Sequence, residues 1–206
     1  MDNLKFKGGE LIATEVQANI HAMYIHKDAD QFRDFDWYLK DAHEFARRLA
    51  YLYKVSLRVA CYVISALSPQ MPWEGGARDN KIVAHRLFKG EHTTQTKANE
   101  DKAKRLLVTK TIKQSDKVIL GTNAWKTRSF ADNIHRPLTS TRVTIDTHAI
   151  GVALGRRAYK HEKQLTAKQY KWIADCYREV ASKLGIRPSM LQSVTWQTFR
   201  FINNII

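Results

Sequence analysis

The strongest constraint on the fold is a twelve-residue run that is apolar on nearly every side. Residues 56–67 read SLRVACYVISAL and carry one charge, at Arg58. The run lacks glycine and proline, so it predicts a helix, and a helix that is apolar all round has to be covered by neighbouring elements. Ser56 is suited to cap its N-terminus, and Pro69 and Pro72 end the pattern. We therefore expect a central buried helix with other helices around it.

Amphipathic patterns on both sides of this run supply the surrounding helices. Between residues 36 and 53, apolar residues recur every three or four positions, at Tyr38, Ala42, Phe45, Leu49 and Leu52. Further helices are predicted over residues 80–88, 99–107, 126–135, 146–155, 166–184 and around 191–199, with an extended stretch at 143–145. The sequence thus predicts an all-α fold, a compact two-lobed array of eight or more helices in one domain, residues 1–206.

The charge of the chain indicates its partner. Lysine and arginine number 34 against 20 aspartate and glutamate, which gives a formal charge of +14. The basic residues are spread among apolar ones, a pattern that indicates a folded face meeting phosphates, and we expect double-stranded DNA as the partner. The alternative is a basic surface that is only solvated.

Several other classes of protein do not fit the sequence. No stretch approaches the roughly 18 apolar residues of a membrane span, and the first residues lack the apolar core of a signal peptide. Two cysteines are too few for a disulfide framework or a four-cysteine metal site, and neither HExxH nor GxxxxGK[ST] occurs. We expect a cytoplasmic protein that needs no metal, cofactor or membrane.

The segment from Gly121 to Gly155 is the one that indicates chemistry. Lys126 stands at the start of one predicted helix and Asp146 at the start of the next, 146 − 126 = 20 residues later. An antiparallel return of the chain over that distance would bring both side chains to one cleft. Without further information, however, Asp146 can equally be a simple N-cap.

In this segment the chain resembles the helix-hairpin-helix DNA glycosylases of the endonuclease III type. Lys126-Thr127 and then Asp146-Thr147-His148 stand where that family has the same residues. Residues 99–107 are similar to its Lys-Ala helix, and residues 59–68 with Asn80-Lys81 are similar to its central helix and following loop. The resemblance covers residues 55–160, with the hairpin at about 115–135. The hairpin is degenerate, because it has one glycine, Gly121, where the family has Gly-x-Gly, and the family's iron–sulfur cysteines are absent. Gly151 also stands where the family often has arginine.

The resemblance implies an enzyme that flips a modified or damaged base out of DNA and cleaves its N-glycosidic bond. Asp146 would stabilise the positive charge that builds on the sugar. Lys126 would attack the same carbon as an AP lyase, or it would be a phosphate-binding or solvated lysine.

The resemblance also indicates DNA contacts. Gln70, Met71 and Trp73 would enter the duplex beside the flipped base, or the loop is a rigid turn with Trp73 packed inside. Trp125 would stack on a base, or be buried. The remaining DNA-binding candidates are Gly121, Asn123, Thr127, Arg128 and His148.

Two other functions stay open at this point. Some phage proteins that resemble this fold are linked to the synthesis of hypermodified thymines, so Asp146 would help to modify a flipped base rather than remove it. The chain could also be a non-catalytic DNA-binding module, in which Asp146 only caps a helix and Lys126 binds phosphate.

Overall fold

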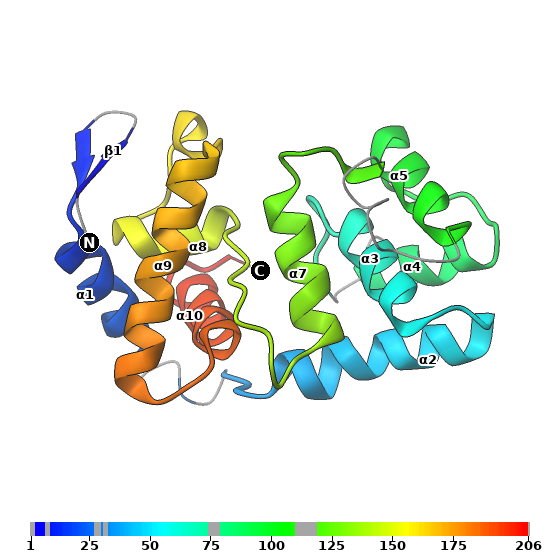
Figure 1. The fold of residues 1–206 in the computed structure, drawn as a ribbon, viewed down its shortest axis with the longest axis horizontal. Coiled ribbons are helices and arrows are strands. Elements are labelled where there is room, and N and C mark those ends of the chain that lie inside the picture. The colour runs from blue at the N-terminus through cyan, green and yellow to red at the C-terminus, as the bar shows by residue number, and fades with distance from the viewer. Residues whose placement is uncertain are drawn as a thin grey trace. The chain divides into compact units, whose positions relative to one another are not determined.

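The chain folds into two helical units, residues 1–38 with 138–206 and residues 39–137. The computed structural model describes residues 3–6, 9–26, 30, 33–73, 79–109 and 119–205. Apart from one small hairpin, the described elements are helices (Figure 1), which confirms the all-α prediction. That hairpin joins β1 (Leu4–Phe6) and β2 (Gly9–Leu11) in antiparallel register. This hairpin was not predicted from the sequence.

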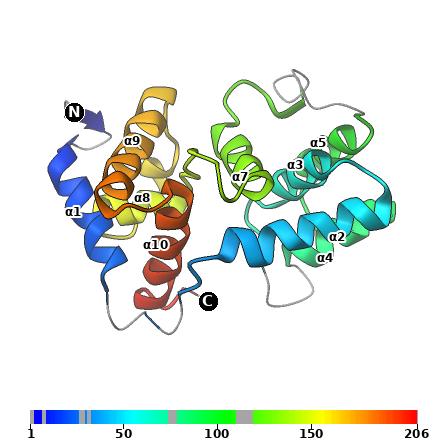
Figure 2. The ribbon, with the colours of Figure 1, turned by 60° about the horizontal axis from the view of Figure 1, so that its bottom comes forward.

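The unit that contains both chain ends is built around α8 (Thr147–Leu154), which contacts α1 (Ala13–Tyr24) and α10 (Pro188–Ile202). The other elements that follow α8 are a short 3-10 helix, η3 (Lys160–Lys163), and α9 (Ala167–Leu184). Figure 2 shows α8 beside α1, α9 and α10. The core of this unit includes Ile20, Ile150, Ile173, Tyr177 and Leu191, each at most 2% exposed.

Helix ends in this unit follow the predicted capping residues. Asp146 caps α8, and Gly155 ends it with a positive φ of 66°. Thr166 and Gln169 form a capping box at the start of α9, and Gly185 ends that helix at φ 67°. A left-handed residue at a helix C-terminus is readily supplied by glycine, so the sequence is sufficient to place these boundaries.

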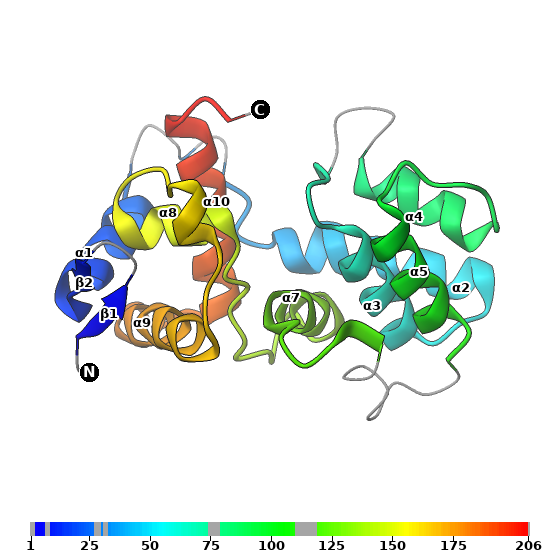
Figure 3. The ribbon, with the colours of Figure 1, turned by 90° about the horizontal axis from the view of Figure 1, so that it is seen from above.

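The other unit surrounds α3 (Leu57–Leu67), the predicted central helix. It contacts α2 (Glu44–Tyr53), α4 (Asn80–Phe88), α5 (Lys97–Leu107) and α7 (Trp125–His135) (Figure 3). Every residue from Val59 to Leu67 is buried, and the Ser56 hydroxyl accepts a hydrogen bond from the Val59 amide at 3.2 Å. The central-helix prediction is confirmed.

The apolar stripe predicted for residues 36–53 is confirmed at Tyr38, Ala42 and Leu49, which are buried, and is wrong at Leu52, which is 58% exposed. A π-helical turn, η2 (Tyr38–His43), precedes α2. The buried face runs from Ala42 through Ala46 to Leu49, at ordinary helical spacing, and Leu52 lies on the flank of that face.

Two further predictions have different outcomes. Residues 143–145, predicted to be extended, belong to no helix or strand, and all three are buried. Residues 115–118, the start of the predicted hairpin, lie outside the described residues. Within the described chain, no single helix is long and apolar enough to cross a membrane. The helices Tyr38–Tyr53 and Leu57–Leu67 together have the length and composition of a membrane span, but they are bent by 116° relative to each other.

Candidate functional site

The turn before α7 is held from inside by Arg128. This side chain is only 8% exposed, and its guanidinium donates hydrogen bonds to the carbonyl oxygens of Gly121 and Thr122. Gly121 has a φ of 86°, a left-handed conformation that glycine adopts without strain. The structure therefore corrects the prediction that Arg128 contacts DNA, since the guanidinium stabilises the turn instead.

The first turn of α7 is fixed on the central helix. The buried Ser65 hydroxyl of α3 donates to the Thr127 carbonyl oxygen at 2.6 Å. No side chain caps α7 among the described residues, and its first helical bond runs from the Arg128 amide to the Ala124 carbonyl oxygen at 3.0 Å. The first-turn amides consequently lack helical acceptors, which leaves a partial positive charge at this end of the helix.

Lys126 lies in this first turn and is half-buried. Within the described part of the chain its amine has no hydrogen bond or ion pair. This state is compatible with each of the roles predicted for Lys126, an AP-lyase nucleophile, a phosphate contact or a solvated lysine. Trp125, immediately before it, is also half-buried, which is compatible with either of its predicted roles.

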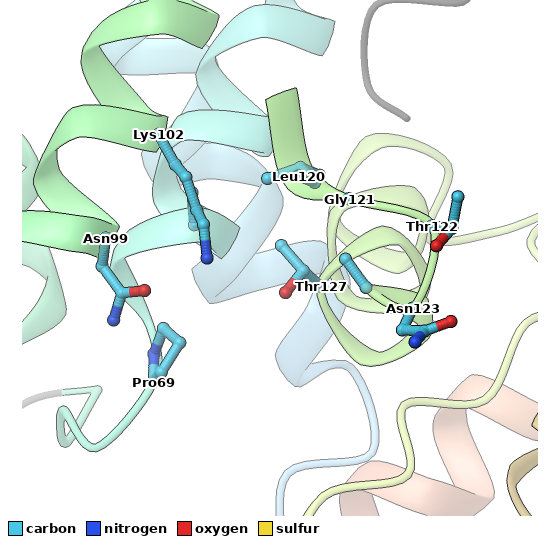
Figure 4. A pocket seen from close by; sticks show the side chains of 10 residues that line it. Pro69, Asn99, Lys102, Leu120, Gly121, Thr122, Asn123 and Thr127 are labelled. Carbon is cyan, nitrogen blue, oxygen red and sulfur yellow. The ribbon is translucent and has the colours of Figure 1, made fainter. Parts of the chain in front are cut away.

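A pocket of about 460 Å³ opens beside this turn (Figure 4). It is bounded by the end of α3, by α5 and by residues 120–127. Three predicted DNA-binding residues, Gly121, Asn123 and Thr127, line it. Asn99 and Lys102 of α5 also line it; they stand on a helix predicted from the sequence but were not predicted as site residues.

The loop after α3 is clamped so that Gln70 is presented outward. The side-chain amide of Gln95 donates to the carbonyl oxygens of Leu67 at 2.7 Å and Pro69 at 2.9 Å. Gln70 itself is exposed and has a φ of 61°. Such a left-handed conformation is uncommon for a residue other than glycine and is often associated with function.

Trp73, at the other end of this loop, is half-buried and packs against other side chains. Its indole N–H donates to the Asp41 carboxylate at 2.7 Å, and the same carboxylate pairs with Lys81 at 2.5 Å. Phe45 and Phe130 meet the indole edge to face at 6.0 and 6.3 Å. The alternative of a packed Trp73 therefore describes this residue.

Met71 lies between these two positions and is half-buried. Its amide donates to the Ser68 carbonyl oxygen at 3.2 Å, which closes the turn in which Gln70 stands.

Asp146 lies in the other unit, at the start of α8. Its Oδ1 accepts the Ala149 amide hydrogen at 2.8 Å, so the residue is an N-cap, as predicted. The other carboxylate oxygen has no hydrogen-bond partner within the described chain, and the residue is half-buried. Burial, with a smaller contribution from the Asp146 charge, raises the pKa of Tyr177 above its ordinary value, so this phenol stays protonated.

His148 follows on the first turn of α8 and is half-buried. Its ring lies against two aromatic side chains of α10, Trp196 at 6.2 Å and Phe199 at 6.1 Å. Part of the His148 ring, a predicted DNA contact, is therefore covered by these two side chains.

Metal ligands do not gather in the described residues, where no group of three histidine, cysteine, aspartate or glutamate side chains could hold an ion. Cys61 and Cys176 are free and buried, and burial raises the pKa of the Cys176 thiol to about 12. Neither thiol is suited to act as a nucleophile at neutral pH.

Comparisons with known proteins identify a family but no activity. A family model described as "Family of unknown function (DUF7178)" matches residues 4–202. No curated protein and no solved structure matches the chain.

Proposed function

The chain belongs to the DUF7178 family, whose function is unknown, and from its own residues we propose that it is a DNA base-excision enzyme. It flips a modified or damaged base out of double-stranded DNA and cleaves the N-glycosidic bond. The observation that carries the proposal is the state of Asp146, whose carboxylate is fixed by one oxygen and open at the other.

Such a carboxylate suits the chemistry of glycosidic cleavage. The bond from C1′ to the base nitrogen breaks and its electron pair leaves with the base, so positive charge builds on the sugar. A fixed carboxylate stabilises that charge without reorganising. Water then supplies hydroxide to C1′ and a proton to the base. The Ala149 amide and the N-terminus of α8 favour the ionised form that this role requires.

Two further features support DNA as the substrate. The net charge of +14 favours binding to the phosphate backbone. Gln70 is exposed on a clamped loop in a left-handed conformation, which suits a side chain that fills the gap left by a flipped base. An enzyme of this kind would act in the cytoplasm of a bacterial or phage-infected cell.

Asparagine at position 146 separates catalysis from capping. Asparagine caps helices about as well as aspartate but carries no charge. We expect Asp146→Asn to fold and bind DNA normally and to lose excision, by roughly 10²-fold or more. Asp79→Asn is the matched control, because Asp79 caps α4 in the same way, accepting the Ile82 amide hydrogen at 2.7 Å.

The assay uses DNA duplexes that each contain one altered base, with mass spectrometry of the products. A free base and an abasic strand support excision, whereas a heavier base still attached to DNA identifies a base-modifying enzyme. Full excision by Asp146→Asn would refute the role of the carboxylate.

A non-catalytic DNA-binding module is the second candidate, favoured by the fact that capping alone accounts for the Asp146–Ala149 contact. It is identified if the wild type binds every duplex tightly and changes none of them.

A further inference from the structure

The pocket between α3, α5 and the turn before α7 has the chemistry of an anion site. Its described lining includes one charged side chain, Lys102, and no carboxylate. Figure 4 shows the Lys102 amine reaching into the space bordered by Asn99, Pro69 and Thr127. Within the described chain this amine has no ion pair, unlike that of Lys104 two residues further on, which pairs with Glu100 at 2.5 Å.

The surroundings of Lys102 add polar groups of the kind that bind phosphate. Asn99, with its carboxamide, and Thr127, with its hydroxyl, lie on either side of Lys102. The uncapped start of α7 contributes partial positive charge at the same wall. An ammonium group with hydrogen-bond donors around it is a common way to hold a phosphate oxygen.

The size of the pocket and its apolar lining residues indicate a ligand larger than a bare anion. A volume of about 460 Å³ lies within the range of small-molecule sites. Ala66, Pro69 and Leu120 give it an apolar part on which a sugar or base can lie.

We propose that this pocket binds one nucleotide unit through its phosphate, with Lys102 as the charged contact. The phosphate belongs either to a DNA strand or to a free nucleotide. The first source rests on the proposed function; the second does not require it.

The first experiment measures duplex affinity against salt concentration for two methionine variants. Lys102→Met removes the charge and keeps most of the side chain. Arg105→Met removes one charge from the same helix at an exposed position that does not line the pocket.

If a strand phosphate binds in the pocket, Lys102→Met weakens binding by roughly tenfold. It also lowers the slope of log K against log salt by about 0.9. Arg105→Met leaves the slope unchanged. Equal slopes in both variants exclude the strand phosphate, while tight binding by the wild type leaves the proposed function standing.

The second experiment tests the free nucleotide on the unaltered protein and so does not depend on a variant that folds. Thymidine 5′-monophosphate and thymidine are titrated while the amide resonances of Gly121 and Thr122 are followed by NMR. Shifts with the monophosphate alone, absent in Lys102→Met, support the site even if the wild type binds no duplex. Equal shifts with both compounds, or none, together with equal salt slopes, overturn the proposal.

Discussion

Gly151→Ala tests how tightly α8 is packed. The added methyl group has two effects on stability, and they are opposite in sign. A Cβ at this position would lie 2.5 Å from Cζ of Phe199 and 3.1 Å from the Arg156 carbonyl oxygen. To restore ordinary contact at 3.4 Å, the phenyl tip would have to withdraw by 3.4 − 2.5 = 0.9 Å. Phe199 is only 2% exposed, so the ring has little room to move.

The magnitude follows from comparing the two effects. Within a helix, alanine in place of glycine stabilises by about 1 kcal/mol through backbone propensity. Forcing a methyl group into a packed core costs about 1–3 kcal/mol. Taking 2 kcal/mol for the clash, we expect Gly151→Ala to destabilise its unit by about 1 kcal/mol net.

Urea denaturation followed by tryptophan fluorescence measures this change. Trp196 lies on α10 together with Phe199, so the probe reports on the affected helices. The control is Phe199→Leu, which removes the atom that clashes. In that background Gly151→Ala should cost less or become stabilising, which a double-mutant cycle detects. Stabilisation by Gly151→Ala in the wild-type background would refute the packing argument.

Two other predictions concern single side chains. Borohydride should trap the protein covalently on a duplex with an abasic site. The Lys126 amine attacks C1′ of the opened sugar, water leaves, and borohydride reduces the resulting imine. An adduct of equal yield in Lys126→Ala would exclude this lysine as the nucleophile. The paired Arg156 guanidinium, which holds the pKa of Glu162 below its ordinary value, should make Glu162→Gln less stable than wild type by roughly 1 kcal/mol at pH 7. Because the folded pKa is lowered, this difference is present above about pH 4.5 and is lost as the pH falls through the lowered value; thermal melts in which the gap persists at pH 3 would contradict the assignment.

The helices that the sequence predicted well are those with a local signal at each end. For α8 the signals are Asp146 and Gly155, and for α9 they are the capping box at Thr166 and the glycine at 185. A cap is made within four residues of chain, so it can be predicted without knowledge of the fold. Leu52 was predicted wrongly because the face that becomes buried is centred on Ala42, Ala46 and Leu49, and the spacing of apolar residues alone also admits Leu52 on its flank.

Site residues whose state depends on distant contacts could not be predicted. Arg128 is two residues beyond Lys126 and seemed equally suited to phosphate, yet its guanidinium turns inward to two carbonyl oxygens of the preceding turn. Lys102 gave no signal beyond its charge, since the pocket exists only where α5 meets the start of α7. Lys126 and Asp146 belong to different units, so their shared cleft stays a prediction.

Gly151 also explains one departure from the glycosylase pattern in physical terms. The endonuclease III type often carries arginine three residues after the histidine of Asp-Thr-His, and here that position is glycine. Since a single Cβ at this position already meets the Phe199 ring at 2.5 Å, a longer side chain requires that ring to move. The same Phe199 ring packs against His148. The lack of room for a side chain at position 151 and the packing of His148 therefore have one cause, the close approach of α10 to α8. Relatives that share this arrangement are expected to have glycine at position 151 together with a large aromatic residue at position 199, and not the arginine.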